Sequence, residues 1–120
     1  MAKKVNANSI PKTVKVGYSQ FSLIPRDEIW AKKQKAVGEC HAYKSIIEYD
    51  KTQNSNELVN TLIHETLHAI AYVFDIEFRN SREEEDVVRK MANGLQTVMG
   101  DNPEFIMWAL KSMEKKLDDE

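Results

Sequence analysis

The sequence has few of the residues that mark disulfide-rich, fibrous or membrane proteins. Its 120 residues include one cysteine, four glycines and three prolines. The single cysteine, Cys40, excludes an internal disulfide and favours a reducing compartment, and the low glycine and proline content excludes collagen-like repeats. The longest uninterrupted apolar run, Ala69 to Phe74, is far shorter than the ~20 residues of a membrane-spanning helix. No secretory signal is recognisable, so we expect a cytoplasmic protein without a membrane segment.

Charge is nearly balanced overall but is distributed unevenly along the chain. The formal net charge is −2 at pH 7. Residues 1–51 carry ten basic and five acidic side chains, whereas residues 52–120 carry seven basic and fourteen acidic ones. This balance is not typical of a general nucleic-acid binder, so we expect no nucleic-acid partner.

The first half of the chain has the two-residue period of strands. Apolar residues alternate from Val14 to Ile24, with a slip near Ser19, and again over residues 37–43 and 45–49. We expect one strand from Val14 to Ile24 that breaks near Ser19 and ends at Pro25. The two later stretches predict two more strands joined by a tight turn, which together make a small antiparallel sheet.

The second half has a helical period and three helix-start signals. Two capping-box patterns, Asn54–Glu57 and Ser81–Glu84, and the pair Asn102-Pro103 each mark a helix start. The predicted helices span residues 54–74, residues 81–100 and the segment from Pro103 onward. The expected fold is α+β, with about three antiparallel strands packed on these helices. We expect residues 1–120 to form one domain in which residues 1–13 are flexible.

The first predicted helix contains the H-E-x-x-H pattern, His64-Glu65-Thr66-Leu67-His68. His68 lies about 40° round the helix from His64 and about 6 Å along it, so both imidazoles can reach one metal ion. Glu65 lies too far round to be a third ligand, but it can reach a water beside the ion, which is the position of a general base. The spacing predicts a zinc site, and the alternative is an accidental cluster of surface side chains.

The apolar side chains of this helix form a separate stripe. They cluster on the arc opposite the two histidines and Glu65, and we expect that stripe to be the buried face of the helix. Its members are Val59, Ile63, Leu67, Ile70 and Phe74.

A catalytic zinc site needs a third protein ligand. The acidic run 83–86 opens the second helix, where carboxylates also favour the helix dipole. Glu84 occupies the third position of the predicted capping box, so its side chain has a local partner. Glu85 borders the apolar stripe of the second helix and is our preferred ligand, because a carboxylate there needs a cation or hydrogen-bond donors. Glu84 and His41 stay open as alternatives.

The sequence resembles the zinc-dependent metallopeptidases of the zincin superfamily. The matching segments are Ile47 to Tyr49 as a short strand, Thr61 to Ile70 around the two histidines, and Glu85 with the apolar residues after it. It is most similar to minimal gluzincin-like peptidases of phages and prophages, akin to the ImmA/IrrE-type group. The resemblance implies His64, His68 and Glu85 as zinc ligands and Glu65 as general base, and a phage protein would act in the host cytoplasm.

The resemblance also implies how a protein or peptide substrate binds. In such families it lies along an active-site strand, here residues 45–49 or 37–43. No histidine follows His68, so the residue that stabilises the oxyanion stays unassigned among Tyr43, Tyr49 and Tyr72. Two other functions stay open. One is a catalytically silent zinc-binding or interaction module of the same fold, and the other is a hydrolase of cell-wall amides. The oligomeric state is not predicted.

Overall fold

The computed structural model describes residues 9–118, with side chains as far as Met113, and it confirms an α+β fold. Its sheet contains β1 (Thr13–Val16), β2 (Ser19–Arg26), β3 (Gly38–His41) and β4 (Ile46–Asp50), in the spatial order β1-β2-β4-β3. The pairs β1–β2 and β3–β4 are antiparallel, whereas β2 and β4 are parallel. The predicted antiparallel sheet of about three strands is thus a mixed sheet of four strands.

The additional strand comes from a turn that the alternating pattern did not reveal. Gly17 has a φ of 59° and forms the loop between β1 and β2 with Tyr18. Glycine adopts this left-handed conformation without the cost that a Cβ atom imposes. The predicted single strand from Val14 to Ile24 is thus a hairpin. Pro25 does not end the second strand, because a proline near the end of a strand costs little ladder bonding.

Two short helical segments lie between the strands. In the basic stretch after β2, α1 (Glu28–Gln34) begins at Asp27, whose carboxylate accepts a 2.9 Å hydrogen bond from the Trp30 backbone N–H. The predicted turn between β3 and β4 is the 3₁₀ helix η2 (Ala42–Lys44). The chain therefore leaves β2, passes through α1 and β3, and returns in β4 beside β2. This crossover makes the β2–β4 pair parallel.

The three predicted long helices are present, and one predicted capping residue is corrected. The Asn54–Glu57 capping box is confirmed and starts α2 (Ser55–Val73). The cap of α3 (Ser81–Asp101) is Asn80 and not Ser81, because the Asn80 side chain accepts a 2.9 Å hydrogen bond from the Glu83 N–H. The helix α4 (Pro103–Asp118) begins at Pro103 as predicted.

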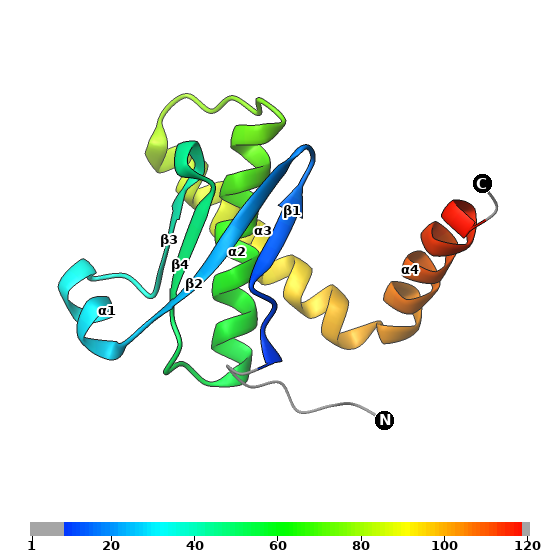
Figure 1. Cartoon of the computed structure of the whole chain (residues 1–120). Helices are drawn as coiled ribbons and strands as arrows, with labels where there is room; N and C mark the ends of the chain where they lie inside the picture. Colours follow the sequence, from blue (N-terminus) through cyan, green and yellow to red (C-terminus); the bar gives the residue numbers. More distant parts are fainter. Residues whose placement is uncertain (1–8, 119–120) are drawn as a thin grey trace.

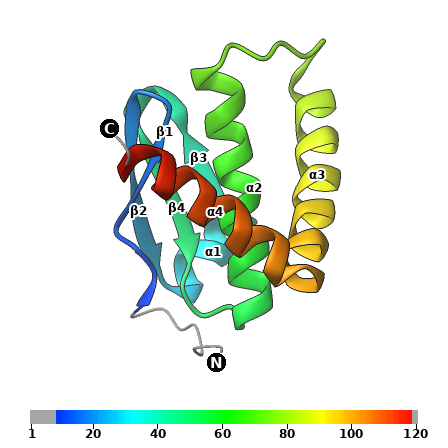
Figure 2. The same ribbon diagram turned by 90° about the vertical axis from the view of Figure 1, so that its right-hand side faces the viewer.

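The elements form layers, from which α4 projects (Figure 1). α2 lies on one face of the sheet, where it contacts β1, β3 and β4, and α3 packs beside α2. The core lies between the sheet and α2. Its buried members are Val16, Phe21, Leu23, Ile47, Tyr49, Leu58 and Ala69. The turned view in Figure 2 shows β1, α2 and α3 side by side on the side of the molecule that faces α4.

The buried face of α2 differs from the predicted apolar stripe. The side chains that the sheet buries include Leu58, Thr61, Glu65 and Ala69, whereas Phe74 is 60% exposed. The helical period was right, but the sheet covers the arc that includes Glu65 because β3 approaches there without a side chain at Gly38. The H-E-x-x-H segment thus lies at the edge of the core.

The start of the described chain is attached to the fold. We expected residues 1–13 to be flexible, and residues 1–8 of this stretch lie outside the described part of the chain. Beyond them, Ile10 packs against the core, and the carbonyl of Lys12 accepts a 2.8 Å hydrogen bond from the Leu23 N–H. Within the described part of the chain, we find no helix with the length and apolarity needed to cross a lipid bilayer.

Candidate metal centre

His64, His68 and Glu85 converge where α2 faces the first turns of α3. The Nε2 atom of His64 lies 2.6 Å from Oε1 of Glu85, and the Nε2 atom of His68 lies 2.9 Å from Oε2 of Glu85. The two imidazole rings are 5.0 Å apart between centroids. Ligand atoms of all three side chains lie within 4.8 Å of one another, so only side-chain adjustment is needed for all three to contact one ion.

Glu84 contacts His68 on the opposite side of the ring. Its Oε2 atom lies 2.7 Å from Nδ1 of His68. Because Asn80 caps α3, Glu83 takes the third helical position that was predicted for Glu84. The Glu84 side chain is directed to His68 instead. A carboxylate on the second ring nitrogen fixes the tautomer and the orientation of a ligating histidine. The two candidate glutamates thus occupy different positions. Glu85 lies between the Nε2 atoms of both histidines, whereas Glu84 contacts only Nδ1 of His68.

The charge around His68 favours its protonated form when no cation is present. Burial lowers the pKa of His68, but the hydrogen bond with Glu84 and the charges of Glu65 and Glu85 outweigh burial, so the pKa is raised. Three carboxylates around two imidazoles form a site that attracts positive charge, whether it comes from a proton or from a metal ion.

Glu65 is buried directly beside these groups. The residue is 7% exposed. Burial raises the pKa of Glu65 to about 7, with Glu85 and Glu39 contributing in the same direction and His68 opposing them. A carboxylate with this pKa exchanges a proton near neutral pH, which a general acid or base requires.

Gly38 lets β3 approach Glu65 closely. A Cβ atom at Gly38 would lie 2.6 Å from Cγ2 of Thr61 and 3.0 Å from Oε2 of Glu65. The absence of a side chain at this position therefore allows the strand to pass directly beside the carboxylate.

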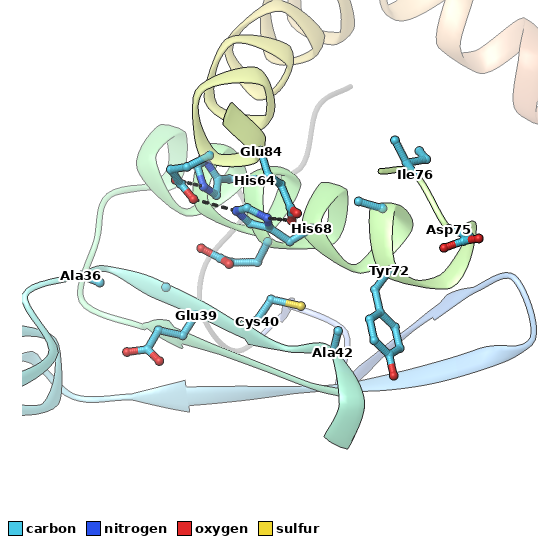
Figure 3. Close-up of a pocket in the computed structure, with 14 residues that line it drawn as sticks. Ala36, Glu39, Cys40, Ala42, His64, His68, Tyr72, Asp75, Ile76 and Glu84 are labelled. Atoms are coloured by element: carbon cyan, nitrogen blue, oxygen red, sulfur yellow. Dashed lines mark hydrogen bonds and ion pairs between the residues drawn. The ribbon is translucent and has the colours of Figure 1, made fainter. Parts of the chain in front are cut away.

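An open cleft of about 720 Å³ runs past these residues. Figure 3 shows His64, His68 and Glu84 on one side and the strand that carries Glu39 and Cys40 on the other. Cys40 points from β3 toward the helices, and burial, with Glu65 and Glu84, raises its pKa to about 12. This thiol stays protonated, so a thiolate ligand or nucleophile is not expected.

β3 is the edge strand on the cleft side of the sheet. It pairs with β4 alone, whereas β4 pairs with both β2 and β3. Of the two stretches predicted to bind substrate, residues 45–49 thus have no free edge, while residues 37–43 contain the strand that does.

The three tyrosines that the sequence left open have different environments. Tyr49 is buried in the core, and Tyr43 is exposed and does not line the cleft. Tyr72 is 59% exposed and lines the cleft beyond His68 (Figure 3). Of the three tyrosines, Tyr72 is therefore the one whose ring faces the cleft.

His41, the third alternative ligand, belongs to a separate cluster. Its Nε2 atom lies 2.8 Å from Glu48 and 3.6 Å from Glu39. Glu48 also accepts a 2.7 Å hydrogen bond from Nε of Arg26, and these contacts outweigh burial and lower the pKa of Glu48. The Arg26 guanidinium thus already supplies the cation for this cluster. The sequence analysis did not predict this cluster, because Glu39 and Glu48 become neighbours only through the β3–β4 register.

No protein-family model, curated protein or solved structure matches this chain. The functional interpretation therefore depends on the geometry of the cleft.

Proposed function

We propose that the chain is a zinc-dependent peptidase. The observation that carries the proposal is the convergence of His64, His68 and Glu85 at an open cleft, with the buried Glu65 carboxylate beside them. An accidental cluster of surface histidines would not combine a shared carboxylate, a second carboxylate on Nδ1 of His68 and a buried acid with a raised pKa.

The donor set fits zinc. Two imidazole nitrogens and one carboxylate oxygen form the ligand set of one common class of catalytic zinc sites, in which a fourth position stays open. His64, His68 and Glu85 would hold the ion, and Glu84 would orient His68. When bound, zinc acidifies a water molecule and polarises a substrate carbonyl.

Glu65 performs the proton transfers in this proposal. It takes a proton from the attacking water and gives that proton to the amine that leaves when the peptide bond breaks. The pKa of about 7 suits both steps, because the group can accept and release a proton at neutral pH. Its close packing against Gly38 holds the carboxylate in place.

The substrate in this proposal is an extended peptide. The free edge of β3 borders the cleft and offers backbone groups for strand addition. Side chains of a peptide bound there alternate between the sheet surface and the cleft, so the cleft residues contact every second substrate side chain.

The test is a comparison of Glu65→Gln with a matched control, Glu77→Gln, which removes an exposed carboxylate. We expect wild type and both variants to bind one zinc ion per chain. Cleavage of unfolded polypeptides should fall at least ~10²-fold in Glu65→Gln and stay unchanged in Glu77→Gln. Stoichiometric zinc without cleavage by the wild type would instead support a silent zinc-binding module. Cleavage of peptidoglycan fragments alone would support a cell-wall amidase.

A further inference from the structure

The helix α4 exposes apolar side chains to solvent over its described length. It packs against the end of α3 and projects away from the sheet and α2 (Figure 1). The Phe105 and Trp108 rings stack on each other with centroids 6.0 Å apart. Five large apolar side chains are between 50% and 62% exposed: Phe105, Met107, Trp108, Leu110 and Met113.

These side chains do not form a single stripe. At ~100° per residue, Met107, Trp108 and Met113 point in directions about 100–140° apart around the helix axis. A helix whose apolar side chains spread over more than one face is normally covered on more than one side. A helix of 16 residues is also marginal without packing partners. The sequence of α4 therefore predicts neighbours that the described part of a single chain does not provide.

The body of the same chain carries an apolar groove that none of residues 9–118 fills. The groove has a volume of about 360 Å³ and lies between β1, α2 and α3. These elements form the side of the molecule that faces α4 (Figures 1 and 2). The groove lining contains two threonines and is otherwise apolar, with Val14, Leu23, Leu67, Ile70, Leu95 and Met99 among its members.

The connection between α3 and α4 keeps α4 away from its own groove. Asn102 is the only residue between the two helices, and Pro103 begins α4 directly after it. One linking residue gives the chain little freedom to turn α4 back. A short hinge of this kind favours exchange of the terminal element with a second chain.

We propose that two copies of this chain form a two-fold dimer by exchanging α4. The α4 helix of each copy occupies the apolar groove of the other, and the two α4 helices cover each other's remaining apolar sides. Five side chains that are about half exposed supply on the order of 500 Å² of apolar surface per copy. With the groove surfaces added on both copies, the total is about 1,200 Å², at the lower end of the ~1,200–2,000 Å² typical of stable interfaces.

The experiment measures the mass of the full chain by sedimentation equilibrium between about 1 and 200 μM. The expected mass is twice 13.9 kDa at the upper concentrations. The double variant Phe105→Ala/Trp108→Ala changes only exposed residues of α4, and Met99→Arg places a charge at the rim of the groove, where the wild-type side chain is 42% exposed. Each variant should raise the dimer dissociation constant at least ~100-fold.

The control variant is Ile29→Ala, which removes an apolar side chain that is 68% exposed on α1, on the other side of the sheet from α4. It should leave the dissociation constant unchanged. Circular dichroism of all variants checks that the fold is retained. A wild-type monomer throughout the concentration range would overturn the proposal, whether α4 then folds onto its own chain or docks on a different protein. A dimer that survives either the α4 variant or the groove variant would also overturn it.

Discussion

The stability of the metal-free protein should depend on pH through Glu65. Its pKa is 4.5 in an ordinary environment and about 7 in the folded chain, because burial disfavours the charged form. Between these two pH values the folded state holds a proton that the unfolded state releases. The free energy of unfolding that this group contributes is thus fully present below pH 4.5 and is lost as the pH rises through about 7. The pKa difference corresponds to about 3 kcal/mol.

Glu65→Gln removes this titration and keeps a neutral side chain of similar size. The assay is urea unfolding of both proteins with a chelator present, at pH values from 4.5 to 8. The variant should gain stability over the wild type as the pH rises, with a total gain of about 3 kcal/mol. Taking the difference between the proteins removes most contributions of groups common to both, such as His68.

Glu77→Gln, which removes an exposed carboxylate, controls for the loss of one negative charge. A stability difference between Glu65→Gln and wild type that does not change with pH would show that the carboxylate is solvated, and the buried general base would have to be abandoned.

Three further substitutions test the groups around the cleft. Gly38→Ala should lower the free energy of unfolding by about 1–3 kcal/mol, because its Cβ atom collides with Thr61, and urea unfolding measures the loss. Glu84→Gln should weaken zinc binding about 10–100-fold in a chelator competition, since His68 loses the carboxylate on Nδ1; unchanged affinity would exclude this orienting role. Tyr72→Phe should lower kcat at least ~10-fold with little change in KM if the hydroxyl stabilises the oxyanion. A rise in KM alone would limit Tyr72 to substrate contact.

Local sequence signals predicted the helices well and the sheet less well. The capping box at Asn54 and the Asn102-Pro103 pair act over three or four residues, so the sequence contains the whole signal. The parallel pairing of β2 with β4 depends on residues more than twenty positions apart, and no local pattern encodes it. Gly17 was the available signal for the hairpin that was predicted as one strand.

In the candidate site, too, features set by nearby residues could be predicted and features set by distant residues could not. Helical geometry alone predicts that His64 and His68 share a face, and it does so because the two residues are one turn apart. The distinction between Glu84 and Glu85 depends on the α3 cap: because Asn80 is the cap, Glu83 and not Glu84 takes the third helical position, and the Glu84 side chain contacts His68. The burial of Glu65 depends on β3 and Gly38, which lie far away in the sequence, so the apolar stripe of α2 gave the wrong buried face.

The most direct test of the proposed centre is a crystal structure of the zinc-loaded protein with anomalous diffraction data recorded at the zinc edge. We predict one strong peak, about 2.0–2.2 Å from Nε2 of His64, Nε2 of His68 and a carboxylate oxygen of Glu85, with Glu65 outside ligand distance. A peak at the cluster of Glu39, His41 and Glu48, or none near the two α2 histidines at full zinc loading, would contradict the assignment of this cleft as a zinc peptidase centre.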